Sequence, residues 1–459
     1  MKVGFTLEKD EFEYDIRGLL MAFYPGADII QDPEPEDAVD VLWNVPTCDL
    51  PGRVDRKTWM KDVMYRRISE ATGITLPWGT LTGIRPTKLA MAELLAGKSI
   101  AEAAEVMEKI HLVSPEKSLL SANIAARERE ILKNIDYTDG YSLYIGIPFC
   151  PTTCLYCSFT SYPMSRWEPR MGEYLDALEK EIDFTAERFG NKKLNTIYIG
   201  GGTPTSLPPA LMERLLSRLE KTFSYQDLQE FTVEGGRPDS ITPEKLAVLK
   251  NHPVTRISIN PQTMNEATLR RIGRRHTVQD IRDAYAMARE MGFDNINMDI
   301  ILGLPEETPA DVAHTLKEIQ KLSPDSLTVH SLAVKRASRL KMEAEGTVVA
   351  GGTQEESEEM MRLSQEAAAA MGMEPYYLYR QKNMAGNLEN TGYARDGKAG
   401  IYNILIMEEK QTIVALGAGT VTKGVFPPDR IERCENVKDI EQYLARIDEM
   451  IERKRKLFS

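Results

Sequence analysis

Three cysteines within eight residues, Cys150, Cys154 and Cys157, are the residues best suited to chemistry in this sequence. The other two cysteines, Cys48 and Cys434, lie far away in the chain and have no Cys or His near them. Three thiolates on one short loop can bind three irons of a 4Fe–4S cluster, because such clusters are held by cysteine thiolates. The fourth iron then has no protein thiolate and can bind a small molecule.

Two alternative explanations fit these cysteines less well. A structural zinc site needs four ligands, and the chain has no histidine between His111 and His252. A disulfide scaffold is typical of short secreted chains with an even number of cysteines, whereas this chain has 459 residues and five cysteines. The low cysteine content and the absence of an export signal in the first residues predict a cytoplasmic protein.

The composition of the chain argues against some kinds of binding partner. The formal net charge of −12 argues against a non-specific nucleic-acid binder, which needs a basic face. No apolar run reaches the roughly 18 residues that a membrane-spanning helix requires, so we expect no membrane span. At 459 residues, the chain is long enough for two or three domains.

Short β-type runs alternate with helical patterns between residues 141 and 334. The β-type runs are rich in β-branched and aromatic residues and cover residues 141–149, 196–199, 230–234, 256–260, 295–302 and 326–332. Helical patterns cover residues 170–188, 209–221, 278–291 and 309–321. This alternation is typical of parallel strands joined by right-handed helical crossovers. We therefore expect an α/β fold, an open partial (βα)6 barrel.

The residues whose side chains could take part in chemistry lie at the ends of these runs, within them or directly after them. The cysteine loop follows the first run, and Gly-Gly-Gly-Thr-Pro at 200–204 follows the second. Active-site groups of βα barrels gather at the carboxyl ends of the strands, so we expect one shared mouth. The later runs place four more candidates there: Glu234, Gln262, Asp299 and Ala333.

The flanking segments lack comparable motifs. We expect residues 1–138 to form an accessory α+β domain, 139–335 the barrel, and 336–459 an α/β extension that caps the barrel. Within the extension, patterns predict helices over 355–371 and 438–457 and strands over 376–380, 402–407 and 412–416.

The spacing CxxxCxxC with an aromatic residue before the last cysteine, followed by GGGTP, resembles the radical S-adenosylmethionine (SAM) superfamily. Residues 142–150, 256–262, 272–276 and 297–305 resemble oxygen-independent coproporphyrinogen III oxidases. The additional N-terminal region and Val-Glu-Gly-Gly-Arg-Pro at 233–238 are most similar to the HemZ branch of that family.

This resemblance implies a radical enzyme. In the resembled oxidases, a reduced 4Fe–4S cluster cleaves SAM to methionine and a 5′-deoxyadenosyl radical, and the radical takes hydrogen from a propionate side chain. Loss of CO2 and of one further electron leaves a vinyl group, and two such events convert coproporphyrinogen III to protoporphyrinogen IX in haem biosynthesis. The partners implied are a porphyrinogen substrate and an electron donor such as flavodoxin or ferredoxin.

The resemblance also implies residue roles, although no general acid or base stands out. The three loop cysteines would bind the cluster. Contacts to the first SAM would come from Tyr144, Tyr156, Gly201, Gly202, Thr203 and Glu234, and contacts to a second SAM from Gln262, Arg274, Asp299 and Ala333. Cations just past the sixth strand, Lys335, Arg336 and Arg339, are candidates for the substrate carboxylates.

One departure supports an alternative function. Oxidases of the family carry a fourth cysteine two residues after the third, whereas this chain has Phe159 there. Cys-x-Phe-x-Ser is closer to the haem chaperones called HemW, which keep the cluster and the SAM site. In that case His276 and His330 are candidate haem ligands, although each is also typical of a hydrogen-bonded active-site or core histidine.

Overall fold

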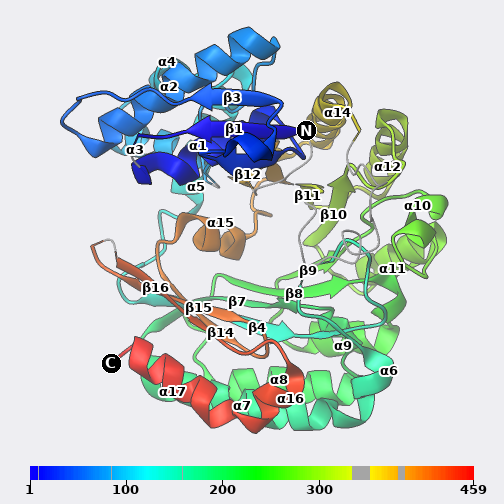
Figure 1. Cartoon of the computed structure of the whole chain (residues 1–459). Coiled ribbons are helices and arrows are strands. Elements are labelled where there is room, and N and C mark those ends of the chain that lie inside the picture. The colour runs from blue at the N-terminus through cyan, green and yellow to red at the C-terminus, as the bar shows by residue number, and fades with distance from the viewer. Residues whose placement is uncertain (9, 84, 158, 333–351, 381–387, 429) are drawn as a thin grey trace.

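Six parallel strands form the centre of the computed structural model, which describes residues 1–8, 10–83, 85–157, 159–332, 352–380, 388–428 and 430–459. Successive strands pair in parallel, and each coincides with one of the six β-type runs of the sequence. The predicted partial (βα)6 barrel is therefore confirmed (Figure 1). The strands are β4 (Gly140–Ile147), β7 (Lys193–Gly201), β8 (Glu230–Gly236), β9 (Arg256–Ile259), β10 (Ile296–Leu302) and β11 (Ser326–Ser331).

Amphipathic helices connect these strands and cover the outside of the barrel (Figure 1). In α8 the buried residues Met212, Leu215, Leu216 and Leu219 recur at helical spacing, which forms one apolar face. Thr277 begins α11 with a capping box that satisfies otherwise unpaired backbone N–H groups. The helices are α6 (Met164–Trp167), α7 (Met171–Phe189), α8 (Pro209–Thr222), α9 (Pro243–Asn251), α10 (Glu266–Arg271), α11 (Val278–Glu290) and α12 (Pro309–Leu322).

The C-terminal segment extends the barrel sheet at both edges. At one edge β13 (Asn390–Ala394) pairs antiparallel with β11, and β12 (Glu374–Tyr379) pairs with β13. At the other edge β14 (Thr412–Leu416) pairs in parallel with β4 and is followed by β15 (Val421–Phe426) and β16 (Arg430–Glu435). The result is one sheet of eleven strands within the described residues. The strands expected over 376–380 and 412–416 are thus confirmed.

The strand expected over 402–407 is wrong, because these residues lie in helix α15 (Ile401–Glu408). A short apolar run does not distinguish a buried strand from a buried helix by periodicity. The expected helix over 438–457 is interrupted at Arg446, whose φ of −122° separates α16 (Ile440–Ala445) from α17 (Ile447–Leu457). The expected helix over 355–371 is α14 (Gln354–Ala370).

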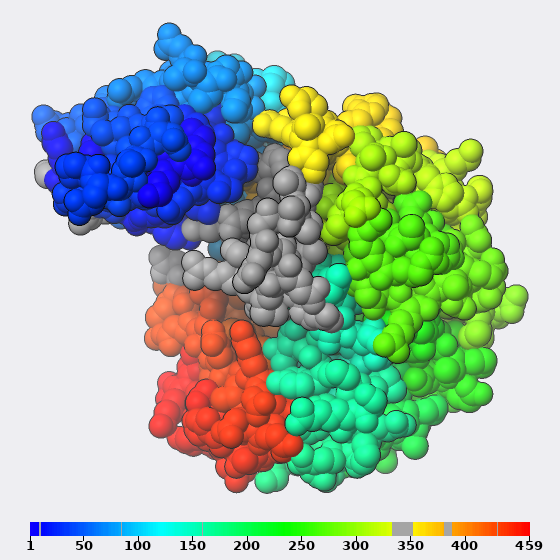
Figure 2. All heavy atoms as spheres, turned by 45° about the vertical axis from the view of Figure 1, so that its right-hand side comes forward, coloured from blue at the N-terminus to red at the C-terminus, as the bar shows by residue number. Residues whose placement is uncertain are grey.

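The N-terminal segment forms its own small parallel sheet. Its buried apolar residues up to Leu76 form a separate core, whereas its later ones pack in a cluster that also contains Leu378 of β12. In Figure 2 its blue surface lies apart from the red C-terminal segment, and the cyan-to-green barrel surface lies to the right of both. Its elements are β1 (Lys2–Thr6), α1 (Glu13–Phe23), β2 (Asp28–Gln31), β3 (Val41–Asn44), α2 (Arg53–Thr72), α3 (Thr87–Leu95), α4 (Ile100–His111) and α5 (Pro115–Ile131). The domain boundaries at residues 138 and 335 stay a prediction. None of the helices in the described ranges combines the length and apolarity needed to cross a membrane.

Candidate functional site

A cavity of about 580 Å³ opens at the carboxyl ends of the barrel strands. This volume lies within the roughly 300–1,000 Å³ range of small-molecule sites. Every predicted cofactor residue that the structure describes lines the cavity: Tyr144, Cys150, Cys154, Tyr156, Cys157, Gly201, Gly202, Thr203, Glu234, Gln262, Arg274 and Asp299. The expected convergence of these residues is therefore present, while their individual roles stay predictions.

The glycine turn after β7 lies directly against the strand that carries the first cysteine, β5 (Phe149–Cys150), which pairs with β6 (Tyr162–Pro163). The Gly202 amide donates to the Ile147 carbonyl at 2.8 Å, and the Thr203 amide donates to the Phe149 carbonyl at 2.7 Å. A Cβ atom on Gly202 would lie 2.7 Å from the Phe149 carbonyl oxygen. The glycine thus permits a close backbone approach that fixes the start of the cysteine loop.

The thiols of this loop lie in a buried environment. Burial raises the pKa of Cys150 to about 12, so its thiolate needs nearby positive charge to form at neutral pH. In the described part of the chain, no three His, Cys, Asp or Glu side chains converge closely enough to bind a single metal ion. This donor set does not fit a zinc site, which gathers its ligands around one ion. It is compatible with a 4Fe–4S cluster, in which each thiolate binds a different iron.

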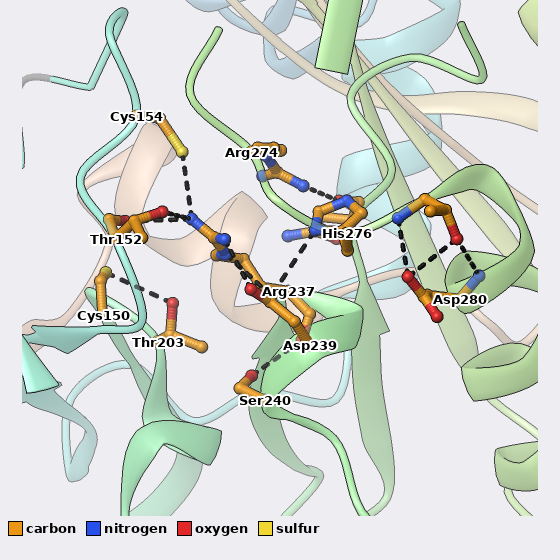
Figure 3. Close-up of polar contacts among 12 residues, drawn as sticks. Cys150, Thr152, Cys154, Thr203, Arg237, Asp239, Ser240, Arg274, His276 and Asp280 are labelled. Carbon is orange, nitrogen blue, oxygen red and sulfur yellow. Dashed lines mark hydrogen bonds and ion pairs between the residues drawn. The ribbon is translucent and has the colours of Figure 1, made fainter. Parts of the chain in front are cut away.

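Arg237 is a buried cation beside the cysteine loop that was not among the residues predicted from the sequence (Figure 3). Its Nη1 lies 3.8 Å from Cys154 Sγ and donates to Thr152 Oγ1 at 2.6 Å. Its opposite edge donates to Asp239 through Nε at 2.9 Å and Nη2 at 2.6 Å. The Glu-Gly-Gly-Arg-Pro motif, one residue longer than the Glu-x-Asn-Pro form of the wider superfamily, is the sequence signal that could have identified it.

Glu234 faces the cavity beside a stack of three tyrosines. Tyr198 donates from its hydroxyl to Glu234 Oε1 at 2.5 Å. The Tyr198 and Tyr402 rings stack with centroids 4.5 Å apart, and Tyr144 stacks on both at about 6 Å. Burial raises the pKa of Glu234 to about 7 although the Tyr198 hydrogen bond opposes the rise. Tyr198 and Tyr402 were not predicted from the sequence, the latter because a strand was expected in place of α15.

The end of β9 and the segments that follow it contribute polar groups without a hydrogen-bond partner in the described part of the chain. Gln262 has a left-handed backbone with φ of 65°, which is uncommon outside glycine and concentrates at functional sites. Among the residues that the structure describes, four buried polar atoms have no hydrogen-bond partner: Ser258 Oγ, Asn260 Oδ1, Gln262 Oε1 and Arg274 Nε. Unsatisfied buried polar atoms are costly, so this wall suits a polar ligand such as SAM.

Arg274 and Tyr156 connect this wall to the cysteine loop. Arg274 donates from Nη2 to the Tyr156 hydroxyl at 3.2 Å, and from Nη1 to the Asn260 carbonyl at 2.5 Å. The Leu155 amide also donates to the Ile272 carbonyl at 3.1 Å. The segment around Arg274 therefore gives the cysteine loop a second set of contacts besides those of the glycine turn.

Asp299 lies inside the cavity on β10 and accepts from Asn297 Nδ2 at 2.7 Å. Although burial opposes the effect, interaction with His330, whose Nε2 lies 3.9 Å away, lowers the pKa of Asp299. His330 Nδ1 in turn lies 3.4 Å from the Tyr379 hydroxyl. His276, the other candidate haem ligand, lies 3.5 Å from Asp239. Ala333 and the candidate cations Lys335, Arg336 and Arg339 lie outside the described residues.

Comparisons with known proteins agree with this geometry. Residues 144–319 match the model of the radical SAM superfamily. The chain is 43% identical over 397 residues, 85% of its length and 79% of the relative's, to the oxygen-independent coproporphyrinogen-III oxidase-like protein HemZ of Bacillus subtilis. The chain belongs to the radical SAM superfamily and, within it, to the HemZ-like family of coproporphyrinogen III oxidase-like proteins.

Two further matches bear on fold and function. The crystal structure of coproporphyrinogen III oxidase (HemN) from Escherichia coli matches with a TM-score of 0.54 at 24% identity, over 72% of this chain and 73% of that one. The haem chaperone HemW of Bacillus subtilis is 40% identical over 195 residues, which are 42% of this chain and 51% of HemW. The cofactors of the superfamily are a 4Fe–4S cluster and SAM.

Proposed function

We propose that this protein is an oxygen-independent coproporphyrinogen III dehydrogenase, which oxidatively decarboxylates two propionate side chains to vinyl groups. The observation that carries the proposal is the convergence of the cysteine loop and polar residues from the neighbouring strands on one cavity. Similarity to HemZ over most of the chain supports coproporphyrinogen as the substrate.

In this proposal Cys150, Cys154 and Cys157 hold a 4Fe–4S cluster, and the buried walls of the cavity hold SAM. Together these cofactors supply a carbon radical that abstracts hydrogen. Glu234 would accept a hydrogen bond from SAM through Oε2, because Tyr198 donates to Oε1. The orphaned polar atoms around Gln262 bind further polar groups of SAM. Enclosure by the barrel keeps water away from the reactive centre.

A haem chaperone is the second candidate function. Phe159 is 70% exposed beside the cysteine loop, at the position where the related oxidases have a cysteine. The 40% identity to HemW covers 42% of the chain. With this function, the protein would bind haem stoichiometrically and leave coproporphyrinogen unchanged.

One anaerobic reaction separates the two candidates. Reconstituted protein is mixed with a reductant, SAM and coproporphyrinogen III, and the products are analysed by mass spectrometry. We expect porphyrinogen that has lost two formic-acid equivalents, together with 5′-deoxyadenosine. Unchanged porphyrinogen, combined with tight haem uptake in a parallel titration, would replace the dehydrogenase proposal with the chaperone.

A further inference from the structure

The guanidinium of Arg237 is held between the cysteine loop and a carboxylate. Arg237 is 3% exposed and follows β8 at the rim of the cavity. Figure 3 shows its Nη1 edge directed at Thr152 and Cys154, while its Nε and Nη2 edge faces Asp239. The distances are 3.8 Å from Nη1 to Cys154 Sγ and 3.0 Å from Nη1 to the Thr152 carbonyl oxygen.

Surrounding residues fix this orientation. Asp239 engages Arg237 in a bidentate pair, the geometry that best restricts a guanidinium. His276, with no exposed side-chain surface, lies 3.5 Å from the same carboxylate. The Thr152 hydroxyl donates to the Gly273 carbonyl at 3.1 Å, which connects the cysteine loop to the turn after α10. These contacts therefore hold the Arg237 guanidinium beside Cys154 Sγ, and a rotamer change would break them.

We propose that Arg237 is a positioning residue that raises the reduction potential of the cluster by donating a hydrogen bond to the Cys154 thiolate. This inference rests on the cluster assignment made under the proposed function. In the step concerned, the oxidised cluster accepts one electron from a one-electron reductant. No proton moves, because a guanidinium stays protonated at all relevant pH values.

The direction of the effect follows from charge. Three thiolates and an oxidised 4Fe–4S core carry a net charge of about −1, which becomes about −2 on reduction; charge and hydrogen bonds to the sulfurs both set the potential. A buried cation beside one thiolate stabilises the more negative, reduced state. Asp239 offsets part of this charge, but it occupies the guanidinium edge that faces away from Cys154.

The test is a potentiometric titration of the full-length, anaerobically reconstituted protein without SAM. The fraction of reduced cluster is measured at each potential by electron paramagnetic resonance. Arg237→Met removes the charge and the donors. At a fixed potential we expect at least a tenfold lower ratio of reduced to oxidised cluster, equal to a fall of about 59 mV for one electron. Arg237→Lys keeps the charge and should recover part of the difference.

Thr152→Val is the matched control for loop bracing. It removes the hydroxyl's bonds to Arg237 at 2.6 Å and to the Gly273 carbonyl at 3.1 Å. The Thr152 carbonyl and Asp239 still hold the cation beside Cys154. We expect the wild-type potential in this variant. A potential in Thr152→Val as low as in Arg237→Met would show that Arg237 only braces the loop, and would overturn the inference.

Iron content separates failure of this inference from failure of the cluster assignment. Wild-type protein that takes up no reducible iron–sulfur cluster would contradict the assignment itself. Equal potentials in wild type and Arg237→Met, at equal iron content, would contradict only the role of Arg237. Should Arg237→Met not hold the cluster, Arg237→Gln tests the charge alone, because it is neutral and keeps a hydrogen-bond donor.

Discussion

Several side chains at the carboxyl end of the barrel lie in surroundings where burial makes their charged forms unfavourable. Burial raises the pKa values of Cys150 and Glu234, and the buried guanidiniums of Arg237 and Arg274 lie next to the same loop. Such perturbed groups in one cavity are typical of functional sites. At this scale the site combines thiols that need positive charge with cations positioned to supply part of it.

Replacing the three loop cysteines with alanine should abolish bound iron and SAM cleavage, because the cluster loses all of its proposed protein ligands. Cys434→Ala is the matched control, since Cys434 is also buried but lies on β16 away from the cavity. Iron assays and quantification of 5′-deoxyadenosine check both variants. Retained SAM cleavage in the triple variant would contradict the cluster assignment.

Glu234 should make stability depend on pH. Its folded pKa of about 7 lies above the ordinary value of 4.5, so the folded state binds more protons than the unfolded state between these values. The free energy of unfolding should therefore fall as pH rises through this window, by on the order of 1–3 kcal/mol. Urea unfolding of SAM-free wild type and Glu234→Gln, at pH values that bracket the window from 4.5 to about 7, measures the difference. Parallel pH profiles of the two proteins would contradict it.

Sequence reasoning identified the site residues that carry recognisable spacing and missed those that depend on packing. The cysteines and the glycine turn come at or after strand ends, and Glu234 and Asp299 lie within β8 and β10. Their convergence could therefore be predicted from topology. Tyr198 could not be selected, because a strand tyrosine is more often part of a core. Its hydroxyl is revealed as a partner of Glu234 only by the distance between them.

At the scale of elements, the glycine turn and the cysteine strand act as one unit. Backbone hydrogen bonds from Gly202 and Thr203 hold the Ile147–Phe149 backbone, which sets the first cysteine. Helix α15 adds Tyr402 to the cavity wall, where its ring stacks on Tyr198 of β7. Its helical state could not be predicted, because a short apolar run such as residues 401–407 has no period that separates a buried helix from a buried strand.

Gly202→Ala should displace the cysteine strand, because the new Cβ would lie 2.7 Å from the Phe149 carbonyl oxygen. We expect a loss of about 1–3 kcal/mol in the free energy of unfolding and a lower iron content after reconstitution. Gly172→Ala is the control: Gly172 lies in α7, where an added Cβ would meet no atom within 4 Å, and we expect a gain of about 0.4–1 kcal/mol. Wild-type stability and iron content in Gly202→Ala would contradict the bracing role of the turn.

At the scale of the whole molecule, distant segments of the chain meet on buried polar networks. Glu389 precedes β13 and accepts from Trp78 Nε1 and from Lys117 Nζ, each at 2.8 Å. This network joins the N-terminal segment to the edge of the sheet next to β11. In a second network, Glu181 of α7 accepts hydrogen bonds from Tyr443 and Lys454, and these bonds hold the C-terminal helices. Both ends of the chain thus support the barrel that forms the cavity.

Glu389→Ala should destabilise the protein by about 3–5 kcal/mol, because it leaves the buried Lys117 ammonium without its buried partner. Glu374→Ala is the control, since Glu374 also pairs across the same region, with Arg127 at 3.6 Å, but has a side chain that is 76% exposed. An exposed pair contributes about 0–1 kcal/mol. Denaturant unfolding compares the variants, and similar small losses in both would contradict a coupling role for Glu389.

The most direct measurement of the proposed dehydrogenase activity is isotope transfer from substrate to cofactor product. Coproporphyrinogen III that carries deuterium on its propionate side chains is incubated anaerobically with the reconstituted protein, SAM and a reductant. We predict deuterium in 5′-deoxyadenosine and a porphyrinogen product that has lost two formic-acid equivalents. Unlabelled 5′-deoxyadenosine beside intact coproporphyrinogen would contradict the proposed function.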